Sequence, residues 1–402
     1  MILFGYLSLR LDWKCFHFKK IPLWHIVKMY VMKNFLVWIL LTGCLVACSK
    51  QAELKDSVSF SERRESVRMS EIISDYSLVK LETKEKDLIL DASMIRIWND
   101  RIYILDCFGQ HKTVWVYDMN GRYVGELGTF GQGPGEYIMP NNLLVDEQNN
   151  RILVKDIARN RLLYYDAETM KCVKEVDIPF YSDCLEYLSE GKLIWYVGSG
   201  CANEGDLQKH IQITDMDLNV INSCIPRLDF PKRGRYNVMT YFHSYNGQVY
   251  FHHPFSDDIY TNKADTVVRQ YTLSMNGLNF PSMEYMKDNL QDFIKHLSQD
   301  GYIQYYEILE NDDKLLCYFG QMDKPHVGVY DKHKGKGYYV ETEKIEDDLG
   351  ILKYVRPKTM YKNRFVSVVY VEDLEEITES SIVYPFLKDE QESGNPLILL
   401  FK

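Results

Sequence analysis

Short apolar runs separated by turn residues dominate the chain from Tyr76 to its end. The first runs cover residues 95–105, 114–117 and 123–124, and the next cover residues 143–145, 152–154, 162–165 and 172–176. Runs of this length, rich in Val, Ile, Leu and Tyr and bounded by Asn, Asp and Gly, are typical of β-strands joined by tight turns. Arg101 and Asp106 recur as Arg151 and Asp156, which indicates an internal repeat.

The repeat continues with weaker copies to the C-terminus. Further apolar runs cover residues 191–196 and 210–215, then 247–251 and 258–271, then 313–316 and 327–331, then 363–370 and 396–400. A period near 40–50 residues with four strands per unit is the signature of β-propeller blades. We therefore predict an all-β fold, a six-bladed β-propeller of four-stranded antiparallel blades. Residues 78–81 would supply the outer strand that the last unit lacks, so strands from both termini would close the ring and remove free edges.

One segment departs from the strand pattern. Residues 284–299 place apolar side chains at helical spacing, with Ser282 as a possible N-cap. This pattern predicts one helix inserted between the fourth and fifth blades. The helix would pack on the rim of the propeller or present its apolar face to a partner protein.

The beginning of the chain has the layout of a secretory leader. Lys33 precedes an apolar run from Phe35 to Cys44, and small residues follow before Cys48. The run is too short to cross a bilayer, which needs about 20 apolar residues. We assign residues 1–31 to a mis-called start or an extended n-region, 32–47 to a signal peptide, 48–75 to a tether and 76–402 to the propeller.

Two local motifs resemble known bacterial families. The segment Leu45-Val46-Ala47-Cys48 resembles the lipobox of bacterial lipoproteins, which implies that Cys48 is lipidated and anchors the protein in the cell envelope. Residues 114–118, 128–137 and 395–399 resemble the six-bladed β-propeller lipoproteins of diderm bacteria, whose repeats are NHL-like. This resemblance implies a fold and an envelope location, at the outer membrane and facing the periplasm or the outside. It implies no activity.

Charge and cysteine content narrow the classes of partner. Residues 1–47 hold six basic side chains and one acidic one, so the remainder has 41 basic and 56 acidic side chains, a net charge of −15. This excess disfavours nucleic acid and anionic membrane surfaces, because both require a basic face. Six cysteines follow Cys48, and export would permit disulfides. Several lie in apolar strand patterns, as Cys317 does, where they would act as small hydrophobes.

The predicted topology brings the polar candidates to one face of the propeller. In a four-stranded antiparallel blade, the loop between the second and third strands and the connection to the next blade emerge together. This face would also receive the loop at residues 201–204, His252, Lys324 and His326. Because propellers bind ligands around the central channel, we expect the ligand site to involve Asp106, Gly131, Gly133, Gly135, Glu136, Tyr137, Asp156 and His253.

Each candidate also has a structural explanation. Glycine-rich turns bind phosphate through backbone amides, but Pro134 and Pro140 lead into a strand instead of the helix that a nucleotide loop requires. Asp106 and Asp156 could bind a cation or act as acid and base, or cap turns through the backbone. His252 and His253 would point to opposite faces of a strand, which disfavours a shared metal. We assign no catalytic residue, metal or cofactor.

The sequence thus favours a binding or interaction module. Loops rich in Tyr and Trp would suit a glycan or peptide ligand. One alternative is a polysaccharide hydrolase or lyase, which requires Asp106, Asp156 and Glu136 to converge in one pocket. Another is a structural subunit of an envelope complex, which requires an exposed apolar patch, expected along the helix at 284–299.

Overall fold

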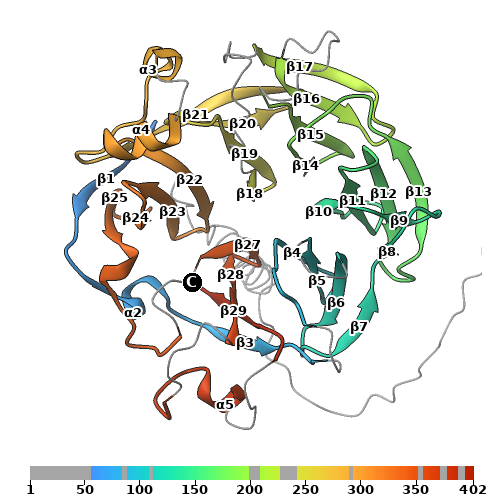
Figure 1. Ribbon diagram of the computed structural model, residues 1–402, viewed down its shortest axis with the longest axis horizontal. Helices are drawn as coiled ribbons and strands as arrows, with labels where there is room; N and C mark the ends of the chain where they lie inside the picture. The colour runs from blue at the N-terminus through green and yellow to red at the C-terminus, as the bar shows by residue number, and fades with distance from the viewer. Residues whose placement is uncertain are drawn as a thin grey trace, which may run out of the picture. The chain divides into compact units, whose positions relative to one another are not determined.

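The computed structural model describes residues 56–83, 88–107, 112–198, 209–226, 242–288, 293–351, 356–371, 378–387 and 394–402. The leader, Cys48 and the loop at residues 201–204 lie outside these residues. The described chain is mostly β and is organised in four-stranded antiparallel groups (Figure 1).

Three separate sheets each contain four consecutive strands. The first has β4 (Met94–Trp98), β5 (Arg101–Asp106), β6 (Thr113–Asp118) and β7 (Tyr123–Glu126). The second has β10 (Pro140–Asp146), β11 (Arg151–Asp156), β12 (Arg161–Asp166) and β13 (Cys172–Asp177). The third has β14 (Cys184–Leu188), β15 (Lys192–Tyr196), β16 (Lys209–Asp215) and β17 (Val220–Pro226).

The fourth and fifth groups are joined into one nine-stranded sheet by β1 (Ser57–Arg63). The fourth group has β18 (His243–Tyr245), β19 (Gln248–His252), β20 (Asp258–Lys263) and β21 (Thr266–Met275). The fifth has β22 (Ile303–Glu310), β23 (Lys314–Gln321), β24 (Lys324–Asp331) and β25 (Lys336–Glu341). Strand β1 runs parallel to both of its neighbours, β21 and β25 (Figure 1).

The last group combines strands from distant parts of the chain. It contains β27 (Pro357–Tyr361), β28 (Arg364–Val369), β29 (Leu397–Phe401) and β3 (Ser77–Lys80). The pairing of β3 with β29 is antiparallel, with Val79 opposite Ile398 (Figure 1).

Small elements occupy the connections between these groups. Strand β2 (Val67–Arg68) pairs with β26 (Ile345–Glu346), and β8 (Thr129–Phe130) pairs with β9 (Glu136–Tyr137). The remaining elements are α2 (Met69–Ile72), α3 (Met283–Asp288), α4 (Phe293–Gln299), η1 (Thr342–Lys344) and α5 (Tyr384–Leu387).

The part of the chain assigned to a tether contains ordered structure. Residues 57–63 form β1, in which Val58 and Phe60 are fully buried. The Phe60 ring occupies space that Cβ atoms at Gly328 and Gly337 would fill, since each would lie 2.8–2.9 Å from a ring carbon. Only two apolar residues alternate in this strand, so its sequence pattern is too short to distinguish it from a charged linker.

Burial explains why the second and third strands of most groups form continuous apolar runs in the sequence, with β20 as an exception. All but the first residue of β5 are buried, because both faces of these strands are covered by neighbouring sheets. The outermost strands, such as β7, alternate between exposed and half-buried positions. The apolar core therefore lies between adjacent groups, as in the cluster that joins β5 and β6 to β11 and β12.

Two helices occupy the segment predicted to form one. Helix α3 begins at Met283, one residue before the predicted start, and α4 ends at the predicted end, Gln299. Residues 289–292, between the two helices, lie outside the described part. The buried side chains of Met286 and Leu297 pack with Phe255, which follows β19. The described part of the insertion thus packs against the fourth group of strands.

Candidate functional site

The strand order fixes which connections share a face. Turns between the second and third strands, and connections between successive groups, leave the same end of the antiparallel groups. Asp106 and Asp156 end the second strands β5 and β11, and His253 follows the second strand β19. The glycine-rich segment at 131–137 connects β7 to β10.

Asp106 and Asp156 hold the chain segments that enter their own groups of strands. The Asp106 carboxylate accepts a hydrogen bond from the Leu90 amide at 2.9 Å. Asp156 accepts from the amides of Ile138, Met139 and Ala158 at 2.9–3.1 Å. Both aspartates are buried, and their equivalent positions explain why the residue recurs in the sequence. Asp106 therefore holds the segment that leads into β4, and Asp156 holds the segment that leads into β10.

The glycine-rich segment binds carboxylates of its own chain. The Gly133 amide donates to Glu136 Oε2 at 2.7 Å, and the Gly135 amide donates to Glu175 Oε1 at 2.6 Å. A Cβ atom at Gly131 would lie 2.0 Å from Glu136 Oε2, so any larger residue there would displace the Glu136 carboxylate. Two of the amides that could bind an anion are therefore occupied by acidic side chains.

Tyr137 is fully buried behind this segment. Its hydroxyl donates to the Leu127 carbonyl at 2.8 Å and accepts from the Val114 amide at 3.1 Å. Burial raises the pKa of Tyr137 to about 12. The Tyr137 side chain therefore attaches the segment between the first and second sheets to strand β6.

His252 and His253 are buried and face different neighbours. The His252 ring stacks on Tyr306 of β22, with ring centroids 3.8 Å apart. His253 Nδ1 lies 3.0 Å from the Tyr196 hydroxyl, and its ring packs against His210. Burial lowers the pKa of His252 to about 4 and that of His253 to about 3. In both rings, Nε2 has no hydrogen-bond partner in the described structure.

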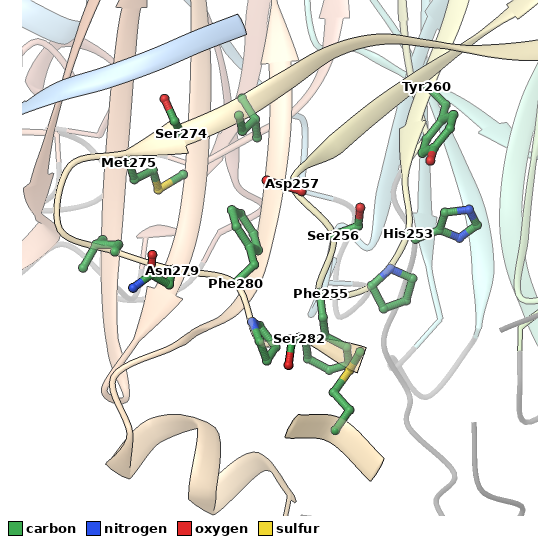
Figure 2. A pocket seen from close by; sticks show the side chains of 15 residues that line it. His253, Phe255, Ser256, Asp257, Tyr260, Ser274, Met275, Asn279, Phe280 and Ser282 are labelled. Carbon is green, nitrogen blue, oxygen red and sulfur yellow. The ribbon is translucent and has the colours of Figure 1, made fainter. Parts of the chain in front are cut away.

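A cavity of about 600 Å³ lies beside His253. Its walls come from the β19–β20 loop at residues 253–257, the end of β21, and the segment that leads into α3 (Figure 2). The side chains that line it include Phe255, Asp257, Met275, Phe280 and Met286. In Figure 2, the Phe280 ring extends from the segment before α3 toward the loop that carries Ser256 and Asp257.

The cavity brings together only one of the residues predicted for the site. His253 lines it, whereas Asp106, Asp156 and the glycine-rich segment do not. The sequence analysis missed Phe255, Asp257 and Phe280, which belong to a strand connection and an insertion. The short turn Pro254–Asp257 after His253 is the one local signal that could have marked this part of the site.

Ion pairs connect the first strands of different groups. Arg96 of β4 lies 2.8 Å from Glu186 of β14, although β10 lies between these strands in chain order. Arg356, just before β27, donates to Glu307 of β22 at 2.7 Å. These contacts place charged side chains at or next to the first strands of different groups.

Three further features of the described residues concern metals, thiols and the membrane. No group of three His, Cys, Asp or Glu side chains there could hold a metal ion. Cys107, Cys172, Cys224 and Cys317 in this part form no disulfide. No helix in the same residues has the length and apolar character needed to cross a membrane.

Comparisons with known proteins give a family and two related structures. A family model described as Domain of unknown function (DUF4934) matches residues 55–402. A Bacteroides fragilis protein, provisionally described as exported, matches at 25% identity and TM-score 0.75 over 86% of this chain and 99% of that chain. A DUF4221 family member from Bacteroides vulgatus matches at 9% identity and TM-score 0.53, over 82% and 96% of the two chains. No curated protein matches.

Proposed function

We propose that this chain, which belongs to the family described as Domain of unknown function (DUF4934), is a lipid-anchored, six-bladed β-propeller that binds a ligand in the cell envelope. The proposal has three parts: the closed propeller, the envelope anchor and the binding cavity. The cavity beside His253 is the observation that carries the functional part.

Contacts between the groups of strands support a closed ring of six blades. First strands contact one another in the order β4, β10 and β14, and β14 contacts β19 of the fourth group. Contacts then run from β18 to β22, from β22 to β27, and from β27 back to β4. An apolar cluster also joins β28 and β29 to β4, β5 and β6. The β3–β29 pair would close the last blade.

The leader supports an envelope location with Cys48 as the lipid-bearing residue. The matching Bacteroides fragilis protein is also described as exported. Mass spectrometry of the mature N-terminal peptide from cell membranes tests this assignment directly. We expect a diacyl or triacyl modification on Cys48 and release of a Cys48→Ser variant from the membrane fraction. An unmodified peptide that begins upstream of Cys48 would contradict the anchor.

The cavity supports binding in preference to hydrolysis. Its volume of about 600 Å³ is within the range of small-ligand sites, and its wall combines apolar, aromatic and polar side chains. The hydrolase alternative requires convergent carboxylates, but Asp106, Asp156 and Glu136 each bind backbone amides of their own segments. We expect the ligand to be a glycan or a short peptide.

Calorimetric titration of residues 49–402 with neutral oligosaccharides and with short peptides tests this binding. We expect saturable binding of one class and a loss of at least tenfold in affinity in a Phe280→Ala variant. A Phe130→Ala variant is the matched control, since Phe130 is exposed and lies outside the cavity. Equal affinity in all three proteins would place binding elsewhere, and absence of binding by both classes would contradict the proposed function.

Exposed apolar side chains favour a second candidate function, that of a structural subunit in an envelope complex. Five of them lie on connections at the face described above: Leu90, Phe130, Met139, Tyr181 and Met322. A partner that covered these positions would remove apolar surface from water. Native gel electrophoresis of detergent-solubilised membranes would then show a larger complex, which a Phe130→Glu, Met322→Glu double variant should dissociate. The same mobility for both proteins would contradict this role.

A further inference from the structure

Apolar and sulfur-containing side chains form the inner wall of the cavity. Phe255, Met275 and Met286 are each at most 6% exposed, and Phe280, from the segment before α3, also lines the cavity (Figure 2). Methionine side chains adapt to ligand shape and contact aromatic rings favourably. This wall suits the aromatic or branched apolar body of a small ligand.

Asp257 places a carboxylate without a counter-charge at the same cavity. Its backbone carbonyl accepts from the Leu273 amide at 2.8 Å, which fixes the loop, while its side chain makes no hydrogen bond or ion pair within the described residues. The neighbouring Asp258 differs, since it lies 3.5 Å from Arg269 and accepts from the Thr272 hydroxyl at 3.0 Å. Of these two adjacent carboxylates, only the one that lines the cavity is unpaired.

An unpaired carboxylate beside aromatic rings is suited to a cation. A protonated amine gains charge-assisted hydrogen bonds from a carboxylate and additional attraction from aromatic faces. An anionic ligand would be repelled by Asp257, because no lysine or arginine of the described residues lines the cavity and the buried His253 ring is neutral at pH 7.

We propose that the cavity binds a primary amine that carries an aromatic or branched apolar body. The ammonium group lies at Asp257, and the apolar body lies among Phe255, Met275 and Phe280. This inference rests on the proposed ligand-binding function and adds the ligand class. The amine can be a small molecule or the free N-terminus of a peptide with an apolar first residue.

Calorimetric titration with matched probes tests the ligand class. The probes are 2-phenylethylamine, its neutral isostere 2-phenylethanol, its anionic counterpart phenylacetate, and the peptide Phe-Gly-Gly with a free or acetylated N-terminus. We expect the amine to bind at least about tenfold more tightly than the alcohol, since one charged hydrogen bond accounts for that factor. Phenylacetate should show no binding. Tighter binding of free Phe-Gly-Gly than of 2-phenylethylamine would identify a peptide N-terminus as the source.

Variants separate the role of the charge from that of the cavity. Asp257→Asn should abolish the preference for amine over alcohol, with an unchanged unfolding temperature. Asp288→Asn, which removes an exposed charge from α3 outside the cavity, should preserve it. Equal binding of amine and alcohol, or a preference that survives in Asp257→Asn, would overturn the ligand class and leave cavity binding intact. If no probe binds, the amine class is wrong, and the oligosaccharide and peptide titrations decide separately whether the binding function fails.

Discussion

At the residue scale, buried polar side chains carry much of the specificity of this fold. Asp106 and Asp156 bind backbone amides that open their own groups of strands, and Glu136 binds the loop that contains it. The sequence repeat identified Asp106 and Asp156 correctly as equivalent residues. Their hydrogen-bond partners could not be predicted, because the amides of Leu90 and Ile138 come from connections without regular structure.

Two of the buried histidines, His252 and His253, make the stability depend on pH. Burial holds the pKa of His252 at about 4 and that of His253 at about 3, below the ordinary value of 6.5. The unfolded chain therefore binds protons at a pH where the folded chain does not. The free energy of unfolding should fall as the pH drops below about 6.5, by up to about 1.4 kcal/mol per pH unit for each ring.

Urea unfolding at pH 7, 6 and 5 measures this dependence. A His253→Gln variant should lose about half of the contribution that His252 and His253 together make to the slope between pH 6 and pH 5. An identical slope in the variant would show that His253 is protonated, or accessible to protons, in the folded protein.

A buried charge cluster connects the fourth and fifth groups of strands. Glu310 at the end of β22 lies 2.6 Å from Lys332 and 3.2 Å from His243 of β18, and all three side chains are almost fully buried. Burial opposes ionisation of Glu310, but the His243 hydrogen bond and the Lys332 charge hold its pKa below the ordinary value. This contribution to stability is present above about pH 4.5 and is lost as the pH falls through the lower folded-state pKa.

Removal of the Glu310 charge should be strongly destabilising. Glu310→Ala leaves Lys332 buried without its counter-charge, and we expect the free energy of unfolding at pH 7 to fall by about 3–5 kcal/mol. The double variant Glu310→Leu, Lys332→Met removes both charges and should recover most of this loss. Chemical denaturation of the three proteins tests this. A double variant as unstable as the single one would show that the pair contributes through packing alone.

At the element scale, strand β1, which the sequence pattern did not predict, joins the fourth and fifth groups of strands. Both groups lie far from β1 along the chain. Its pairing with β21 and β25 is supported by the Phe60 ring, which packs over Gly328 and Gly337. The central strands were predictable because burial on both faces gives long apolar runs. Strand β1 was not, because its partners lie more than 200 residues away and only Val58 and Phe60 are apolar and buried.

Truncation of the Phe60 side chain tests the importance of β1. Phe60→Ala should lower the free energy of unfolding by about 3–5 kcal/mol, because a buried ring leaves a cavity against two glycines that cannot fill it. Ser59→Ala, at the neighbouring half-buried position, should change it by less than about 0.5 kcal/mol. Similar values for both variants would show that β1 is dispensable for stability.

At the scale of the whole molecule, residues 56–80 connect with groups of strands from the second half of the chain. Strand β3 covers the edge of β29, whose five residues are all buried. An apolar strand that loses its neighbour exposes unpaired backbone groups and becomes a template for aggregation. The ligand cavity was hidden from sequence reasoning for a related reason, since its walls come from residues 253–260 and 273–286, which are adjacent only in the folded chain.

Deletion of the N-terminal strands tests the proposed closure. A chain that begins at residue 82 lacks β1, β2 and β3 and should form soluble oligomers or aggregates in size-exclusion chromatography with light scattering. A chain that begins at residue 56 retains them and should remain monomeric. A monomeric protein of unchanged unfolding temperature after the longer deletion would contradict the closure.

The most direct measurement is a crystal structure of residues 49–402 grown with 2-phenylethylamine. We expect six four-stranded blades in a closed ring, with β3 as the outer strand of the last blade. The amino group of the ligand should lie within hydrogen-bonding distance of Asp257, and its ring should contact Phe280. An open arrangement of the blades, or an empty cavity with the amine bound elsewhere, would contradict the proposal of a propeller that binds its ligand beside His253.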